Sequence, residues 1–315
     1  MNTLPVVPAH RLEARPEERR WLVESLWAEQ AVGIVGGEPK CCKSFLALDM
    51  AVAVASGTPC LRRFAVPRPG RVLLYAAEDA QHIVRARLQG ICAAAGVDLR
   101  DLDVHVITAP TLRLDLRDDQ LRLDDTVERL QPRLLILDPF VRLHRIDENA
   151  SAEVAPLLAQ LRELQRRHGL AVLLVHHARK GAAHARPGQA LRGSSEFHAW
   201  SDSSLYLRRD NERLTLSVEH RAAPSSGGLV VELSVRGSAV ALQLVDAPVD
   251  TPVALVHDHV ERVLRVLASS DTPLTVAQIV EQCPMRTQRL YRILADLVRE
   301  RRATRDGQGY RVETR

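Results

Sequence analysis

The chain has 315 residues, of which 46% are hydrophobic and 26% charged, the composition of a soluble globular protein with room for more than one domain. Aromatic residues amount to 3%, which excludes a surface that stacks many nucleic-acid bases on side-chain rings. The net charge of +4 is compatible with a nucleic-acid partner but does not by itself indicate one. The five cysteines follow no zinc-ligand spacing, the N-terminus shows no signal pattern and no apolar run is long enough to span a bilayer. We therefore expect a cytoplasmic protein with no membrane partner.

Composition and periodicity divide the chain into a loose lead-in over 1–20, a core over 21–245, a linker over 246–256 and a small helical domain over 257–315. Continuous apolar runs in the core predict buried strands at 31–35, 72–76, 104–107, 134–140 and 171–175. Apolar residues at helical spacing and closing glycines predict the helices between them, at 45–55, 82–95, 126–130 and 154–168.

The last part of the core has a different pattern. Short apolar stretches separated by hairpin-like turns predict further strands at 204–207, 214–218, 229–235 and 240–245. Strands that alternate with helices and are followed by antiparallel strands indicate an α/β fold with a mostly parallel sheet, extended at one edge. Two stretches are ambiguous. Residues 21–27 form a short amphipathic piece, and 112–123 alternate Leu with Arg or Asp, which is typical of a half-exposed strand or an extended loop.

The stretch 36–44, between the first strand and the first helix, is the one around which the core is organised. It fits the phosphate-loop pattern G-x-x-x-x-G-K-[ST] from Gly37 to Ser44, except that Cys42 replaces the second glycine. The following helix offers free N–H groups and a positive dipole end to an anion. We therefore expect ATP and Mg²⁺ as cofactors, with Lys43 on the β- and γ-phosphates and Ser44 on the metal. The alternative is an ordinary strand–turn–helix with a surface lysine. The expected nucleotide-binding residues are Gly37, Glu38, Pro39, Lys40, Cys41, Cys42, Lys43, Ser44 and Phe45.

Cys42 is the one unusual residue of this loop. Glycine at that position lets the backbone approach the phosphates without a Cβ atom, and the small cysteine fits if the residue has near-helical φ and ψ. We expect either reduced nucleotide affinity or a thiol close to the phosphates. The helix N-terminus, Lys40 and Lys43 are expected to lower the pKa of a thiol here. We hypothesise that bound nucleotide shields Cys41 or Cys42 from alkylation.

Two acidic residues follow buried strands. Asp138 comes after four apolar residues and before Pro139, the Walker B setting, in which a carboxylate holds Mg²⁺ through water or through Ser44. The alternative for Asp138 is a helix cap. Glu78 follows the second strand, where a carboxylate can orient and deprotonate an attacking water; otherwise it is an exposed acid at a strand end. Asp79 is expected to cap the next helix.

Residues after later strands complete the predicted site. One of His176 and His177 is expected to hydrogen-bond the γ-phosphate or the water, while the other packs inward. Arg192, beyond a loop of small residues, is a candidate arginine finger for a neighbouring subunit, or else a surface arginine before a turn. His220 and Arg221 are a weaker candidate for the same role. The groups expected at the carboxyl ends of the parallel strands, where such sheets bind ligands, are Gly37, Glu78, Asp138 and His176.

The C-terminal domain is predicted to be winged-helix-like. Helices over 260–268, 275–282 and 286–302 precede a turn at 306–309 and a short strand, which together give three helices and a β-wing. A basic last helix fits a DNA major groove. Alternatively, the domain binds protein, or the basic helix face is merely solvated. The arginines of that helix are Arg286, Arg289, Arg292, Arg299, Arg301 and Arg302.

Five motifs occur in a fixed order along the core: Gly36-Gly37-Glu38-Pro39-Lys40 to Lys43-Ser44, Ala77-Glu78-Asp79, Leu137-Asp138-Pro139, His176-His177-Ala178-Arg179-Lys180-Gly181 and Arg192-Gly193-Ser194-Ser195. Together they resemble the RecA-like ATPases of the plasmid RepA type, which are hexameric replicative helicases, and their phage- and chromosome-borne relatives. The resemblance covers about 21–245 and implies a RecA-like P-loop core in a ring, with ATP between subunits. It implies that Glu78 is the catalytic base, that the motif of His176 and His177 senses the γ-phosphate, and that Arg192 acts in trans. Cys42 and the C-terminal domain depart from the family pattern.

Two functions fit these observations. The first is an ATP-hydrolysing, Mg²⁺-dependent motor of RecA type that forms a homo-oligomer, such as a hexameric ring, and acts on DNA in replication or recombination, as a helicase does. The second is a nucleotide-gated DNA-binding regulator with slow or no hydrolysis, in which the winged helix reads the DNA.

Overall fold

The structure is a computed structural model that describes residues 4, 6–12, 20–177, 194–210, 213–245, 263–270 and 272–283, with further residues between 290 and 312. The chain forms two compact units, Met1–Val245 and Asp246–Arg315. The predicted linker over 246–256 lies outside the described residues. Among the helices that the structure describes, none combines the length and apolar character needed to cross a bilayer.

A nine-stranded sheet forms the centre of the first unit, with the order β11-β10-β9-β8-β3-β7-β6-β4-β5. The strands from β8 to β5 in this order are parallel, whereas β9, β10 and β11 extend the β8 edge as antiparallel strands. This arrangement confirms the predicted α/β fold and is that of a RecA-like P-loop core. The strands of the sheet are β3 (Val32–Gly37), β4 (Val72–Ala76), β5 (Val104–Val106), β6 (Leu134–Asp138), β7 (Ala171–His177), β8 (Ser203–Asp210), β9 (Arg213–His220), β10 (Ser226–Arg236) and β11 (Ala239–Leu244).

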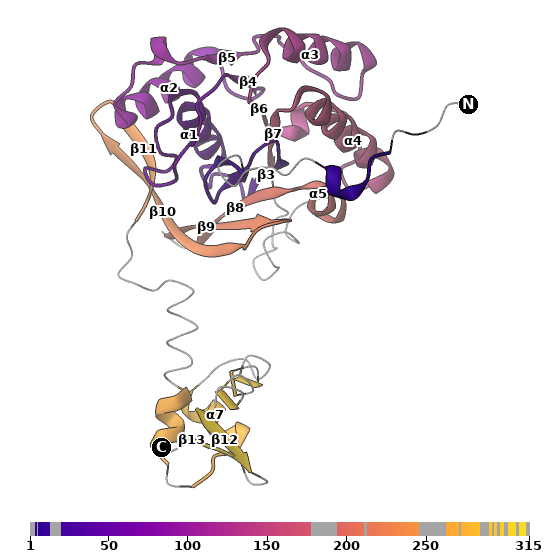
Figure 1. Ribbon diagram of the computed structural model, residues 1–315. Helices are drawn as coiled ribbons and strands as arrows, with labels where there is room; N and C mark the ends of the chain where they lie inside the picture. The colour runs from indigo at the N-terminus through magenta and orange to yellow at the C-terminus, as the bar shows by residue number, and fades with distance from the viewer. Residues whose placement is uncertain are drawn as a thin grey trace. The chain divides into compact units, whose positions relative to one another are not determined.

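Helices cover both faces of the sheet (Figure 1). One hydrophobic cluster joins α1 and α2 to one face, and a second cluster joins α3, α4 and α5 to the other. The described helices of this unit are α1 (Lys43–Ser56), α2 (Gln81–Ala95), α3 (Arg117–Leu130), α4 (Ser151–His168) and α5 (Ser194–Trp200), with short 3-10 turns η1 (Ala9–Arg11), η3 (Leu99–Asp101) and η4 (Phe140–Arg142). The helices α1, α2 and α4 end at glycines with left-handed φ, as their sequences predict.

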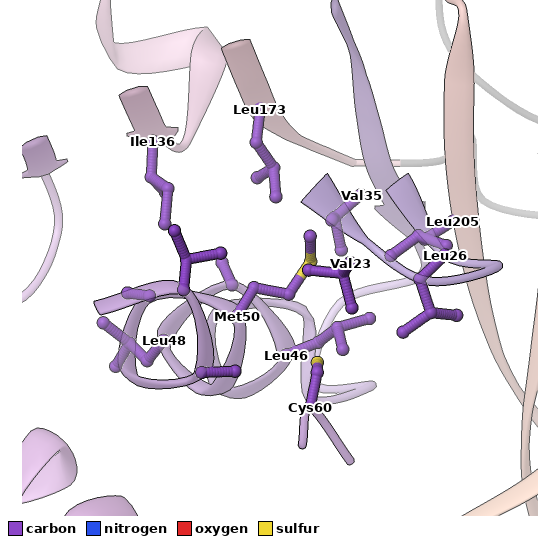
Figure 2. Packing of buried hydrophobic residues seen from close by; sticks show 14 of the residues in the cluster. Val23, Leu26, Val35, Leu46, Leu48, Met50, Cys60, Ile136, Leu173 and Leu205 are labelled. Atoms are coloured by element: carbon purple, nitrogen blue, oxygen red, sulfur yellow. The ribbon is translucent and has the colours of Figure 1, made fainter. Parts of the chain in front are cut away.

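The helix α1 is buried around most of its circumference. Figure 2 shows Leu46 and Met50 of this helix packed among side chains that include Val35 and Leu173 from central strands. Val23 comes from a hairpin before the sheet, formed by β1 (Trp21–Val23) and β2 (Trp27–Ala28). Burying one such side chain fully stabilises the fold by about 1.5–3 kcal/mol. This packing fixes the N-terminal end of α1 against the ends of the strands.

Three local elements were predicted incompletely. The alternating stretch 112–123 was expected to be a strand or loop, but α3 begins within it at Arg117. Leu123 and Val127 are buried on one face of α3, four residues apart, and the acidic first turn suits a helix N-terminus. The ambiguous piece 21–27 belongs to the β1–β2 hairpin. The short helix α5 was not predicted.

In the second unit, α7 (Val276–Gln282) begins at Thr275, whose side chain forms a capping box with Gln278. The strands β12 (Ala303–Asp306) and β13 (Gly309–Val312) pair in antiparallel fashion, with Asp306 opposite Gly309. Residues 307–308 of the predicted turn lie outside the described residues. The helix predicted over 286–302 lies partly outside the described residues, and the winged-helix layout stays a prediction. The predicted DNA-facing arginines that fall outside the described residues are Arg286, Arg289, Arg292, Arg299 and Arg301.

Candidate functional site

A cavity of about 360 Å³ opens at the carboxyl ends of four neighbouring strands, β3, β7, β6 and β4. The phosphate loop joins β3 to α1, Asp138 ends β6, His177 ends β7, and Glu78 lies two residues beyond β4. Segments far apart in the sequence therefore meet at one place. The residues that line the cavity are Lys40, Cys41, Cys42, Lys43, Ser44, Phe45, Glu78, Asp79, Arg87, Asp138, Val175 and His177.

The first residue of the loop pattern, Gly37, has no space for a side chain. Its φ is +151°, and a Cβ atom there would meet the carbonyl oxygen of Leu207 at 2.2 Å and Cys41 Sγ at 2.8 Å. Lys40 and Cys42 have φ of 64° and 65°, in the left-handed region. The cysteine therefore adopts a conformation that favours glycine, at a cost of about 1 kcal/mol, rather than a right-handed helical one.

Lys43 is held at the base of the loop. Its side chain is buried, and its Nζ donates a hydrogen bond of 2.7 Å to the carbonyl oxygen of Glu38. Burial lowers the pKa of the Lys43 ammonium, while the charges of Asp138 and Glu78 favour its charged form. Glu38 therefore takes part through its backbone, and neither its side chain nor Pro39 lines the cavity.

The two thiols of the loop differ. Cys41 is 1% exposed, and its Sγ donates to the carbonyl oxygen of Glu38 at 2.8 Å. Burial raises the pKa of the Cys41 thiol, with the charge of Lys43 acting in the opposite direction. The expected lowering of a thiol pKa is therefore wrong for Cys41, because desolvation exceeds the attraction of the nearby cation.

Asp138 and Ser44 form the part of the cavity suited to a hard cation. The Ser44 hydroxyl hydrogen-bonds the Asp138 carboxylate, and burial raises the pKa of Asp138 to about 6. The nearby charges of Asp79 and Glu78 act in the same direction as burial, whereas the hydrogen bond from Ser44 and the charge of Lys43 oppose it. Oxygen ligands in a cluster of negative charge fit Mg²⁺, so these residues match the metal implied by the loop pattern.

Two arginines that were not predicted bind the acidic side of the cavity. Arg142, in η4, donates from Nε to Glu78 Oε1 at 2.9 Å. Arg87 of α2 forms an ion pair with Asp79 and lies over the ring of Phe45, 5.4 Å from its centroid. Asp79 is consequently not the cap of α2, whose N-terminal cap is Ala80 without a side-chain hydrogen bond. No local sequence signal connects Arg142 with Glu78, because they meet only when β4 and β6 lie side by side.

The two histidines point to opposite faces of β7, since consecutive residues of a strand alternate. His177 lines the cavity, whereas His176 is buried on the other face, with its ring centroid 4.4 Å from that of Phe197. Burial lowers the pKa of His176 to about 4, with Glu148 opposing this shift. Of the two candidates, only His177 can therefore reach a ligand directly.

Of the candidates for an arginine finger, the described residues His220 and Arg221 do not line the cavity. Arg192 lies outside the described residues. Arg221, just beyond β9, forms an ion pair with Asp202 at 3.2 Å. The Nδ1 of His220 lies 3.1 Å from the Oγ of Ser203.

The sheet, the glycine-dependent loop and the acidic residues opposite it define a P-loop ATPase. A family model described as "AAA domain" matches residues 2–183, which is more than half of the chain. The chain belongs to this AAA-domain family of P-loop ATPases. Membership points to nucleotide binding and hydrolysis, typically with Mg²⁺.

Proposed function

We propose that the chain is a cytoplasmic, oligomeric motor of RecA type, related to the RepA-type helicases, which hydrolyses ATP with Mg²⁺ and acts on DNA. The observation that carries this proposal is the meeting of Lys43, Ser44, Asp138 and Glu78 around one cavity at the ends of adjacent strands. These four side chains supply the parts that phosphoryl transfer to water requires: a phosphate cation, metal ligands and a base.

Phosphate binding is assigned to the loop from Gly37 to Phe45. The N-terminus of α1 directs free N–H groups at the phosphates, and Lys43 leaves the Glu38 carbonyl to reach the β- and γ-phosphates. Ser44 and Asp138 would hold Mg²⁺, and the bound ion would neutralise part of the phosphate charge.

Hydrolysis is assigned to Glu78, with help from His177. Glu78 orients a water and accepts its proton, which requires its carboxylate to leave Arg142. His177 contacts the γ-phosphate or that water. Arg192 is the proposed arginine finger for the neighbouring subunit's site. Arginine supplied in this way neutralises charge in the transition state.

DNA binding is assigned to the second unit. Its capped helix α7 and the β12–β13 hairpin fit the winged-helix layout. The basic residues of the helix predicted over 286–302 suit a phosphate backbone or a major groove.

Two features favour the second function, a nucleotide-gated DNA-binding regulator. Glu78 is paired with Arg142, and Cys42 is strained in the left-handed region. Both features favour slow hydrolysis. The regulator would bind DNA tightly in an ATP-dependent manner, with little or no turnover.

The deciding experiment measures ATPase activity with and without single-stranded DNA, together with oligomer mass with and without ATP. The motor predicts DNA-stimulated hydrolysis and unwinding of a forked duplex, both lost in Lys43→Ala, Glu78→Gln and Arg192→Ala. Arg166→Ala, an exposed arginine at the end of α4, is the control that keeps both activities. Tight ATP-dependent DNA binding without unwinding would favour the regulator.

Action of Arg192 in trans has its own test. A mixture of the Arg192→Ala and Lys43→Ala chains should regain ATPase activity, because mixed oligomers contain sites with an intact loop facing an intact arginine. Failure to regain activity, with both variants folded and assembled, would argue against trans action.

A further inference from the structure

The adjacent cysteines of the phosphate loop face different surroundings. Cys41 Sγ is directed into the loop, where it donates to the Glu38 carbonyl and lies 3.9 Å from Lys43 Nζ. Cys42 is half-buried and lines the cavity. Cys41 lines the same cavity but is only 1% exposed, so a reagent that enters the cavity reaches the Cys42 thiol more readily.

An arginine of β8 lies close to Cys42. Arg209, near the end of β8, places Nη2 of its guanidinium 4.0 Å from Cys42 Sγ. Lys40, two residues before Cys42 in the loop, is a further cation and lines the cavity. The surroundings of this thiol thus favour an approaching anion, as expected of a loop that receives phosphates.

We propose that Cys42 is a thiolation site that takes an anionic low-molecular-weight disulfide, and that the resulting mixed disulfide closes the loop to nucleotide. The Cys42 sulfur attacks one sulfur of the reagent, a new sulfur–sulfur bond forms, and the bond within the reagent breaks. The Cys42 sulfur is oxidised, and the departing half is reduced and leaves as a thiol with the proton that Cys42 gives up. The expected loss of nucleotide binding rests on the proposed function.

A disulfide between Cys41 and Cys42 is a poorer product. The Cα atoms of adjacent residues lie about 3.8 Å apart across a trans peptide, whereas disulfides usually span about 4.4–6.8 Å. Such a bridge would also require Cys41 to give up its hydrogen bond to the Glu38 carbonyl. The geometry therefore favours an external partner on Cys42 alone.

An adduct on Cys42 Sγ would occupy the cavity in which the proposed phosphates bind. Lys43 and Ser44 follow Cys42 directly in the chain and line the same space. Bound nucleotide and the adduct consequently exclude each other. Nucleotide at about ten times its Kd should slow the thiolation roughly tenfold, because only the free loop reacts.

The test treats the reduced full-length chain with oxidised glutathione, locates the adduct by peptide mass spectrometry and measures binding of a fluorescent ATP analogue with Mg²⁺. We expect a glutathionyl group on Cys42, at least tenfold weaker nucleotide binding, and recovery after reduction. Cys42→Gly should acquire no adduct there, and its affinity for nucleotide should be the same before and after the treatment. Cys92→Ser, which removes a buried thiol of α2, should behave like the parent chain.

Arg209→Ala tests the charge argument. It should slow the reaction with oxidised glutathione roughly two- to five-fold, the range for one exposed charge, and leave the reaction with the neutral 2-hydroxyethyl disulfide at the parent rate. An adduct on Cys41, an adduct without loss of nucleotide binding, or loss of two thiols without a gain in mass would each overturn the inference. If the reduced chain binds no nucleotide at all, the proposed function fails, while the position of the adduct still decides whether Cys42 is the thiolation site.

Discussion

The buried His176 should make the stability of the core depend on pH. It is 2% exposed, and burial lowers its pKa to about 4 from the ordinary value of 6.5. Above pH 6.5 the histidine is neutral in both folded and unfolded chains and has no effect. Between pH 6.5 and 4 only the unfolded chain takes up the proton, so the free energy of unfolding falls as pH falls. From about pH 7.5 to pH 5 this difference amounts to about 2 kcal/mol.

The assay is urea unfolding of the nucleotide-free full chain at both pH values, for the parent and for His176→Phe. Titratable groups around the ring, which include Glu148, His144 and His177, are present in both chains, so their contributions largely cancel in the comparison. The parent should lose about 2 kcal/mol more than the variant on acidification. His176→Gln provides a second neutral variant in case the larger ring disturbs the core. Equal losses in the parent and in both variants would refute the reasoning.

Three further substitutions separate the parts of the site. Arg142→Ala frees Glu78 and should raise ATP turnover roughly two- to five-fold, the range expected from the loss of an exposed ion pair, without changing the Kd for ATP. A fall in turnover would contradict the idea that Arg142 restrains Glu78. Asp138→Asn removes a carboxylate whose pKa burial raises to about 6, so the charged carboxylate destabilises the fold above that pH. Urea unfolding at about pH 8 should therefore show that the variant is about 1–3 kcal/mol more stable than the parent. Nucleotide titration should show that the variant has lost the Mg²⁺-dependent part of the affinity. No gain in the stability of Asp138→Asn would count against a buried charge at this position. Gly37→Ala should destabilise the chain by at least about 2 kcal/mol more than Gly96→Ala. The added Cβ meets a carbonyl oxygen at 2.2 Å in the first variant and no atom within 4 Å in the second. Similar melting temperatures for the two variants would contradict the close contact at Gly37.

Features that depend on local pattern could be predicted from the sequence. Val154, Leu157, Leu158, Leu161 and Leu164 follow helical spacing, and all five are buried on α4. The apolar run 72–76 is β4 with the same bounds, because a strand covered on both faces needs no polar alternation. The meeting of the phosphate loop with Asp138 and Glu78 at one cavity was also predicted, since parallel strands bring their carboxyl ends to one edge.

Features that depend on partners distant in the sequence could not be predicted. Arg142 reaches Glu78 across 64 positions of the chain, and Arg209 reaches Cys42 across 167. The pKa shift expected for a thiol of the loop had the wrong sign for Cys41, because charge was considered without burial. Local charge pattern indicates which ions are near, but the fold decides how much water remains to screen them.

The conformation of Cys42 can be weighed against what surrounds it. A non-glycine residue in the left-handed region costs about 1 kcal/mol, less than the stabilisation of about 1.5–3 kcal/mol from burying one large apolar side chain of α1. The fold therefore tolerates the cysteine without requiring it, and glycine would be the more stable residue at this position. Stability thus gives no reason for a thiol here, whereas its place in the cavity beside Arg209 gives a chemical one. Cys42→Gly should accordingly raise the stability of the chain while removing its response to disulfides.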